Sequence, residues 1–173
     1  MQEECFRYVH ITHRTTSSKE LHVVWAFDLF RNRISILGME NPFLINFPKL
    51  GAPEIGYISV TEQQQLVPFE VKRIFWTYYT PESIVRGRHA HHTTEQVLIA
   101  AAGRIIVTTE LADGTIQTFR LEDPHVGLYV PPHAWHTMQY SHSAVQLVLA
   151  SAPYDEADYL RTYDEFKRVW QNK

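Results

Sequence analysis

Short apolar and alternating runs dominate the chain from Phe43 onward. Proline, glycine or polar clusters separate these runs, which read FLINF, YISVTE, FEVKRIFWTYY, QVLIAAA, RIIVTT, IQTFRL, VGLYV and AVQLVLAS. So many short strands at close spacing predict an all-β sandwich or barrel. The step Asp113–Gly114 lies between two of the runs, and it predicts a tight hairpin because glycine readily takes the positive φ that such a turn needs.

The pattern changes after Pro153. Asp155 and Glu156 suit the start of a helix, and large or apolar residues then recur at helical spacing. These residues are Ala157, Leu160, Tyr163, Phe166 and Trp170. The spacing predicts a C-terminal helix over residues 155–171, with this stripe against the sheet or a partner subunit.

Residues 1–42 precede the β-like part of the chain and show no clean periodicity. We therefore divide the chain into an N-terminal extension of unassigned structure, residues 1–42, and a domain over residues 43–173 that includes the helix. Within the extension, the large apolar groups of residues 21–37 favour packing against the sheet or across a dimer interface. Residues 1–20 are predicted to be disordered.

Length and charge narrow the classes of protein. A chain of 173 residues suits a single domain, and a net charge of -3 gives no general reason to bind nucleic acid. The single cysteine, Cys5, leaves no disulfide framework and no thiolate metal cluster, which fits a reducing compartment. Charges interrupt the most apolar stretch, so no membrane span is predicted. These features indicate a cytoplasmic protein that binds neither nucleic acid nor membranes.

Several of the ten histidines follow an order that suggests a site. His89 and His91 are two residues apart in a predicted strand and therefore share a face, and Glu95 joins them if the strand continues without a bulge. Later in the chain come His133 and His136. The order of these groups, with glycines and a proline between them, is the two-part signature of the cupins. The predicted fold class is therefore a cupin, or double-stranded β-helix (jelly roll), followed by one α-helix.

Three interpretations of the histidines remain open on spacing alone. Some of them, first of all His92, His125 and His142, can simply sit in a sheet with satisfied hydrogen bonds. Three imidazoles and a carboxylate also suit a divalent transition metal with open positions, which is the interpretation that spacing favours. The third is metal-free acid and base catalysis, because an imidazole can take and return protons near neutral pH.

Longer segments resemble one particular group of cupins. They are LINF, PFEVKRIFW, RGRHAHHTTEQVL, VGLYVPPHAWHTM and LVLASAPYDEADYLRTYDEFKR, and they run from about Phe43 to Trp170. In these segments the chain resembles the sugar-nucleotide 3,4-ketoisomerases, WxcM-like cupins that act on dTDP-4-keto-6-deoxyglucose in deoxysugar biosynthesis for bacterial surface polysaccharides. The combination of RGxHAH, GLYV, WH and the tyrosine-rich ending is more specific than the general cupin signature.

The resemblance implies a homodimeric jelly roll that moves a keto group from C4 to C3 of a dTDP-sugar without a metal or other cofactor. A base removes the C3 proton, an enediol forms, and C4 receives a proton. Carried over onto the matching HAH, the proton-transferring residues are His89 and His91, with His91 the first choice for the base. Arg86 can hold the diphosphate or a sugar oxygen, or else form a salt bridge at the rim. The remaining substrate-binding candidates are Glu95, His136 and Tyr78.

The chain departs from that family at two places. Isoleucine, Ile55, stands where an Asp-x-Arg-Gly step commonly has its arginine, and Phe75-Trp76 replaces a Tyr-Tyr pair of which one phenol is thought to be catalytic. These departures favour a second hypothesis, a non-catalytic cupin that binds a sugar nucleotide or acts as a partner subunit. The intact RGxHAH and WH segments favour the isomerase. A metal-dependent cupin enzyme is the third hypothesis.

Overall fold

The computed structural model describes residues 41–62 and 65–171, with side chains as far as Val169. The predictions for residues 1–40 lie outside the described residues, and the proposed boundary at residue 42 stays a prediction. The described elements, in chain order, are β1 (Phe43–Asn46), β2 (Lys49–Ala52), β3 (Gly56–Ser59), β4 (Arg73–Thr77), β5 (Val85–His91), β6 (Gln96–Ala102), β7 (Ile105–Glu110), β8 (Ile116–Leu121), β9 (Val126–Val130), β10 (Trp135–Tyr140), β11 (Val145–Ala150), a 3-10 helix (Glu156–Asp158), β12 (Tyr159–Leu160) and α2 (Tyr163–Gln171).

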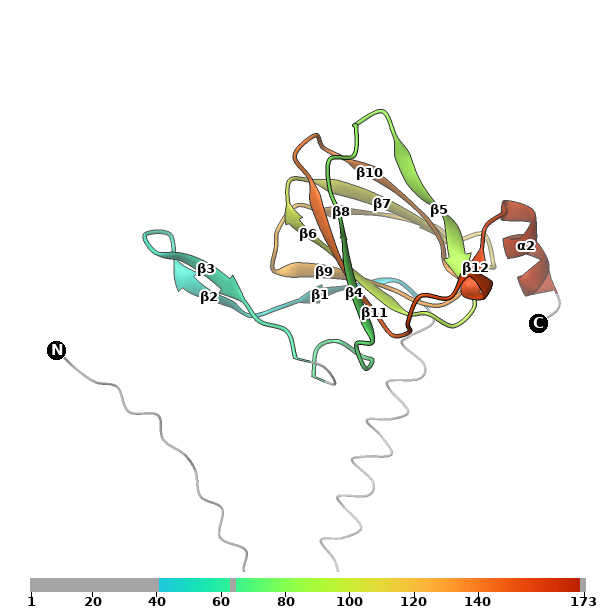
Figure 1. Ribbon diagram of the computed structural model, residues 1–173, viewed down its shortest axis with the longest axis horizontal. Coiled ribbons are helices and arrows are strands. Elements are labelled where there is room, and N and C mark those ends of the chain that lie inside the picture. The colour runs from blue at the N-terminus through green and yellow to red at the C-terminus, as the bar shows by residue number, and fades with distance from the viewer. Residues whose placement is uncertain (1–40, 63–64, 172–173) are drawn as a thin grey trace, which may run out of the picture. The chain divides into compact units, whose positions relative to one another are not determined.

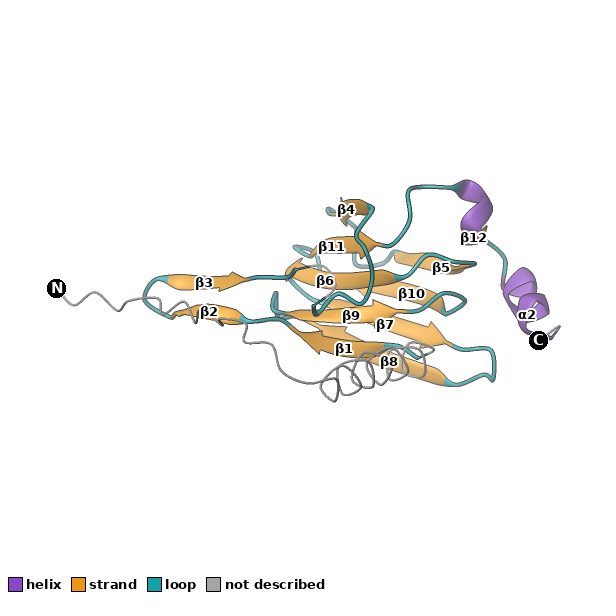
Figure 2. Ribbon diagram, turned by 90° about the horizontal axis from the view of Figure 1, so that it is seen from below, coloured by secondary structure: helices purple, strands orange, loops and turns teal. Residues whose placement is uncertain are grey.

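Two five-stranded antiparallel sheets face each other, in the orders β1-β9-β6-β11-β4 and β12-β5-β10-β7-β8 (Figures 1 and 2). A third sheet is the hairpin β2–β3, which projects from the sandwich (Figure 1). The predicted jelly roll followed by a single helix is confirmed. The predicted turn at Asp113–Gly114 is confirmed as well, because Gly114 takes φ +84° and the Asp113 carboxylate accepts from the Thr115 amide at 2.8 Å.

The alternating residues that the sequence pattern predicted form the core between the two sheets. Each of these side chains is almost fully buried, and both sheets contribute. The core includes Leu98, Leu128 and Val148 from the first sheet and Ile105, Val107, Leu121 and Met138 from the second. A second cluster covers the outer face of the first sheet, and it takes Val67 and Phe69 from the stretch before β4. This packing on the outer face explains why β4 does not begin at Phe69, where the predicted run over residues 69–79 begins.

The predicted start of the C-terminal helix is wrong. The helix begins at Tyr163, and residues 156–160 form the 3-10 turn and β12, which pairs with β5. Thr162 supplies the N-cap: its hydroxyl accepts from the Glu165 amide at 3.2 Å while the Glu165 carboxylate accepts from the Thr162 amide at 3.1 Å. This reciprocal pair is a capping box. Phe166 is fully buried against Ala90 and Leu160, so this residue of the predicted stripe does pack against the sheet.

No helix in the described part of the chain is long and apolar enough to cross a bilayer.

Candidate active site

A bulge in β5 sets the direction of the RGRHAH side chains. Gly87 and Arg88 have φ +82° and +58°, and the pairing with β10 slips from His136 opposite His89 to Thr137 opposite Gly87, which leaves Arg88 as the extra residue. A Cβ on Gly87 would lie 2.7 Å from the His136 carbonyl oxygen, so this close approach requires glycine. The turn in the backbone leaves Arg88 exposed.

The bulge brings Arg86 onto the face that carries the histidines. Arg86 pairs with Met138, a core residue of the inner face, and cross-strand partners share a face. A regular strand would have placed Arg86 and His89, three residues apart, on opposite faces. Arg86 is nevertheless exposed, so it lies at the rim of the inner surface, where its guanidinium can meet a ligand from solvent.

Three histidine rings meet on this inner face. The ring centroid of His89 lies 4.6 Å from that of His136 and 5.1 Å from that of His91, while His91 and His136 are 6.2 Å apart. His91 and His136 are buried, and His89 is half-buried. The structure therefore brings together three of the predicted site residues, and His89 is the one that solvent reaches.

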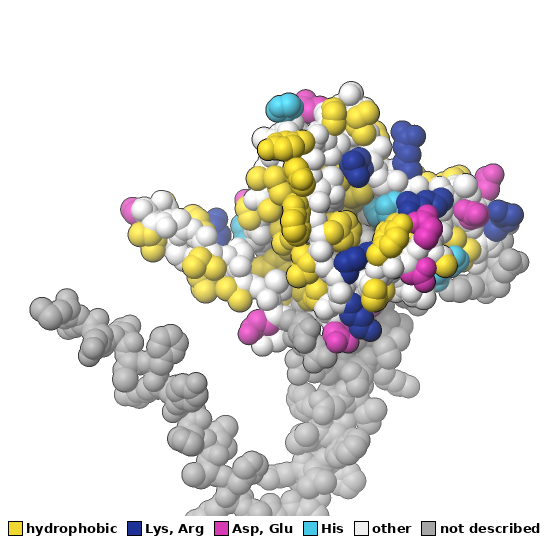
Figure 3. Space-filling model, in the orientation of Figure 1, with side chains coloured by type: hydrophobic (Ala, Val, Ile, Leu, Met, Phe, Trp, Pro, Cys, Tyr) yellow, Lys and Arg dark blue, Asp and Glu magenta, His cyan; other side chains and the backbone are white. Residues whose placement is uncertain are grey.

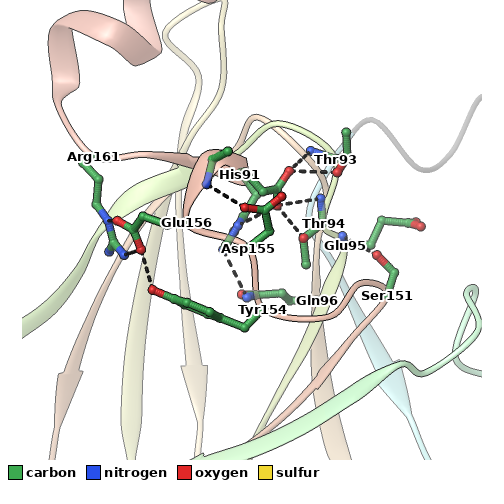
Figure 4. Close-up of polar contacts among 12 residues, drawn as sticks. His91, Thr93, Thr94, Glu95, Gln96, Ser151, Tyr154, Asp155, Glu156 and Arg161 are labelled. Atoms are coloured by element: carbon green, nitrogen blue, oxygen red, sulfur yellow. Dashed lines mark hydrogen bonds and ion pairs between the residues drawn. The ribbon is translucent and has the colours of Figure 1, made fainter.

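Both ring nitrogens of His91 are occupied by protein groups. Nδ1 lies 3.1 Å from Asp158 Oδ2, and Nε2 lies 3.2 Å from the Gln96 Nε2 amide (Figure 4). The Gln96 amide donates to Nε2, so the proton of the neutral ring is on Nδ1 and is donated to Asp158. Asp158 is held in turn by the amide and hydroxyl of Thr93, each at 2.8 Å.

The other two histidines are each tied through one hydrogen bond to the backbone. His136 Nδ1 donates to the Ala134 carbonyl at 3.0 Å, and His89 bonds to the backbone of Gly87. Among the described residues, no side chain bonds to the second ring nitrogen of His89. That nitrogen is therefore the accessible proton acceptor of the cluster.

Burial holds all three imidazoles in their neutral form. Desolvation is the largest cause in each case and a neighbouring histidine is the second, and together they lower the pKa of His89 to about 4, of His91 to about 4 and of His136 to about 3. Asp158 opposes the shift at His91. A neutral imidazole can accept a proton at physiological pH, so His89 suits the role of a general base.

Glu95 is not brought to the histidines. Strand β5 ends at His91, and the carboxylate of Glu95 accepts from the Tyr129 hydroxyl at 2.7 Å, beside the cluster on the outer face of the first sheet. Figure 4 shows it directed away from His91. Within the described residues, no group of three or more His, Cys, Asp or Glu side chains is arranged to hold a metal ion.

Tyr78 is not brought to the histidines either. It follows β4, is 54% exposed, and stacks edge-on against Tyr79 with 5.0 Å between ring centroids. It shares parity with Trp76, which is 62% exposed on the outer face, whereas Phe75 points inward against the core. Of the two residues that replace the family's tyrosine pair, Phe75 is the one on the inner wall.

A cation on this wall escaped the sequence reasoning. The Arg73 guanidinium lies 5.2 Å from the ring centroid of Phe75 and 5.7 Å from that of Tyr154, and its charge contributes to the lowered pKa of His91. Its buried Nε has no hydrogen-bond partner among the described residues. Strand parity with Phe75 could have indicated its direction, but the sequence carries no signal that ties β4 to β5.

The segment after β11 forms the remaining wall, and the sequence reasoning assigned it to the helix. Tyr159 stands over the histidines, with its ring centroid 4.3 Å from that of His91 and 5.2 Å from that of His89. Arg161 lies 4.0 Å above the Tyr159 ring and donates to both carboxylate oxygens of Glu156, at 2.9 and 2.8 Å. The Tyr154 hydroxyl donates to the same carboxylate (Figure 4).

The arrangement has the groups needed for proton transfer at a carbon beside a carbonyl group. Neutral imidazoles can take a proton from carbon, while guanidinium groups and a phenol on the same face can stabilise the oxyanion that forms.

Comparison with known proteins gives a consistent result. Residues 40–171 match the family model described as FdtA: WxcM-like, C-terminal. The TDP-4-oxo-6-deoxy-alpha-D-glucose-3,4-oxoisomerase of Aneurinibacillus thermoaerophilus is 43% identical over 132 residues, which cover 75% of this chain and 92% of that protein.

Two solved structures are similar over about three quarters of the chain. QdtA, a sugar 3,4-ketoisomerase from Thermoanaerobacterium thermosaccharolyticum in complex with TDP, has a TM-score of 0.72 and 34% identity, covering 76% of this chain and 96% of its own. The WlaRB TDP-quinovose 3,4-ketoisomerase from Campylobacter jejuni has a TM-score of 0.70 and 35% identity, covering 75% and 98%.

Proposed function

We infer that the chain, which belongs to the FdtA (WxcM-like, C-terminal) family, is a TDP-sugar 3,4-ketoisomerase. It moves the keto group of a TDP-4-keto-6-deoxyhexose between C4 and C3 by histidine acid and base chemistry. The observation that carries the mechanism is the half-buried, neutral His89, whose second ring nitrogen is open on the inner wall. A catalytically idle cupin would not need such a group beside two further imidazoles and Arg73.

His89 is the base in this mechanism. It removes the C3 proton, the C3–H electron pair forms the C3=C4 bond, and the carbonyl electrons move to O4. O4 gains a proton to give the enediol, O3 then loses its proton as the C3=O bond forms, and the imidazolium returns a proton to C4 to give the 3-keto sugar. The sequence reasoning preferred His91, but both of its ring nitrogens are engaged, by Asp158 and Gln96. His91 therefore serves better as the neighbour that fixes the position of His89.

Cationic side chains supply the anion contacts. Arg73 lies on the inner wall with a buried, unpartnered Nε, which supports a role at the oxygen that becomes negative in the enediolate. Arg86 lies at the rim on the same face, so it is the better candidate for the diphosphate. His136 stands beside His89 and completes the imidazole wall.

The reaction in this form requires no metal or other cofactor, because enolisation needs only a base and donors to the oxyanion. We therefore expect turnover to survive strong chelation, and elemental analysis to find no stoichiometric transition metal. A tightly held ion whose removal abolishes turnover would instead support the metal-dependent alternative.

The hairpin β2–β3 supports the expectation of a homodimer. An isolated two-stranded ribbon is only marginally stable in water, and this one exposes several large apolar side chains (Figure 3). They are Leu50, Ile55, Tyr57, Ile58 and Val60. Beside the hairpin lies a groove of about 390 Å³, lined in part by Phe47, Tyr57 and Leu147. A second copy of the chain would cover both surfaces.

The oligomeric state can be tested by light scattering on the full chain. Ile58→Asp should convert a dimer to a monomer, because Ile58 is 67% exposed in the single chain and the substitution puts a charge on the apolar surface. The matched control is Ile116→Asp on β8 of the second five-stranded sheet, where Ile116 is 64% exposed. This substitution should leave the dimer intact. A wild-type monomer would contradict the proposal. The single cysteine suits a reducing compartment, and the cytoplasm is the location that we propose.

The function is tested by an NMR time course with TDP-4-keto-6-deoxyglucose. The C4 carbonyl signal should give way to a C3 carbonyl, and deuterium should enter the sugar in heavy water. His89→Asn should abolish both changes while it leaves TDP binding intact. The absence of any conversion by wild-type protein that binds TDP would favour the non-catalytic alternative.

A further inference from the structure

Strand β12 directs one tyrosine toward the histidines. Tyr159 pairs with His91 and Leu160 pairs with Ala90. Leu160 and Ala90 are buried together with Phe166, so Tyr159 and His91 share the opposite face, which is the inner one. The ring distances of 4.3 Å to His91 and 5.2 Å to His89 agree with this placement.

The Tyr159 hydroxyl has no hydrogen-bond partner within the described part of the chain, although the ring is half-buried. Two other tyrosines near the C-terminus differ in this respect. Tyr154 donates to Glu156, and Tyr163 donates to Glu110 at 2.8 Å. The free phenol of this segment is therefore the one that faces the imidazoles.

The 3,4-isomerisation needs more than one proton carrier. Besides the proton that passes between C3 and C4, a proton must leave O3 and another must reach O4. On the inner wall, Phe75 cannot do this because it has no ionisable group. We propose that the Tyr159 hydroxyl carries the proton between O3 and O4, an assignment that rests on the proposed isomerase function.

The step balances as follows in the forward direction. As His89 takes the C3 proton, Tyr159 gives its hydroxyl proton to O4, and the enediol forms beside a phenolate. The phenolate then removes the O3 proton, the O3–H electron pair forms the C3=O bond, and the C3=C4 pair takes a proton from the His89 imidazolium at C4. The enzyme ends in its starting protonation state, and no oxidant or metal is consumed.

Two charges favour this use of the residue. Arg161 lies 4.0 Å above the Tyr159 ring and is fixed through two bonds to Glu156, so a positive charge stands beside the phenolate while it exists. Arg73 lies on the adjoining wall, close to Tyr154, whose ring is 5.8 Å from that of Tyr159.

The test is Tyr159→Phe in the full chain, assayed with TDP-4-keto-6-deoxyglucose. Loss of a proton-transfer group should lower kcat by about 10²- to 10⁴-fold, while KM stays within about threefold because only the hydroxyl has gone. The melting temperature and TDP affinity should match those of the wild type. Tyr163→Phe removes a hydroxyl outside the site, and it should retain wild-type kcat.

The outcomes separate this proposal from the function on which it rests. Wild-type kcat in Tyr159→Phe would overturn the proposal, and so would a loss that appears only as raised KM, as weaker TDP binding or equally in Tyr163→Phe. If the wild-type protein itself fails to convert the substrate, the proposed function fails first.

Discussion

Asp158→Asn tests how the C-terminal segment positions the imidazole cluster. The Asp158 side chain is 10% exposed and accepts from His91, from Thr93 and from Thr94. Asparagine keeps the shape but has one acceptor oxygen, so its amide group must face donors that a carboxylate had satisfied. Either a threonine amide loses its partner or the His91 ring must change tautomer, against the donor that Gln96 presents to its other nitrogen.

The magnitude follows from the number of charged hydrogen bonds that are lost. A hydrogen bond to a charged group contributes about 1.5–3 kcal/mol to stability. In Asp158→Asn, one or two such bonds are lost because the new amide group faces another donor. We therefore expect the free energy of unfolding to fall by roughly 2–4 kcal/mol. For a chain of this length that corresponds to a fall in Tm of about 5–15 °C. Movement of His91 against His89 should also lower kcat by about 10- to 100-fold, since catalytic geometry tolerates little displacement.

Thermal melts and steady-state rates measure both effects, and the matched control is Asp155→Asn. Asp155 caps the 3-10 turn by accepting from the Ala157 amide at 2.9 Å, a role that asparagine fills equally well. The control should therefore keep wild-type Tm and kcat. If Asp158→Asn has the Tm and the kcat of the wild type, the role given to the Asp158–His91 contact is refuted.

Three further predictions concern pH and the bulge. Because the base must be unprotonated and burial lowers the pKa of His89 to about 4, kcat/KM should stay level as the pH falls through 6.5 and decline only toward about 4; a decline centred at 6.5 would contradict the assignment. The same shift affects stability. Because the pKa values of His89, His91 and His136 are lowered in the folded chain, the unfolded chain binds more protons as the pH falls. The contribution of these residues to the free energy of unfolding is therefore complete above pH 6.5 and is lost as the pH falls toward about 4 to 3. Thermal melts at a series of pH values should show this loss as a falling Tm. Gly87→Ala should destabilise the fold by about 1–3 kcal/mol, because the new Cβ meets the His136 carbonyl oxygen in a backbone conformation that alanine rarely adopts; unchanged denaturant midpoints would contradict this.

Most strands of the two large sheets could be predicted from the sequence because they have one face in the core. The alternation of residues 105–110 and 116–121 is the direct consequence of that burial, and the hairpin between them follows from Asp113–Gly114. The pair His89 and His91 was predictable for the same reason. His136 required only the order of the cupin signature, and it lies beside His89 as that order implies.

Tertiary contacts decided what sequence periodicity missed. Residues 155–160 carry helical spacing, yet the Asp158 carboxylate bonds to Thr93 and Tyr159 pairs with His91. Residues 156–158 therefore form a 3-10 turn, and Tyr159–Leu160 extend the sheet as β12. The local signal for the true helix start was the capping box from Thr162 to Glu165, which the sequence analysis overlooked. Glu95 was predicted to face the histidines on the assumption that the strand alternation continues past His91. Strand β5 ends at His91, so the alternation does not apply to Glu95.

The bulge and the C-terminal segment together suggest how the site can operate with Phe75 on its inner wall. The bulge at Arg88 turns Arg86 to the face of His89, so one short segment carries both the proposed anion contact and the proposed base. The C-terminal segment adds Asp158 behind the cluster and Tyr159 over it, so a phenol reaches the histidines from β12 although β4 offers none. With the role proposed for Tyr159, the lack of a phenol on β4 is compatible with catalysis, because β12 presents another phenol to the histidines.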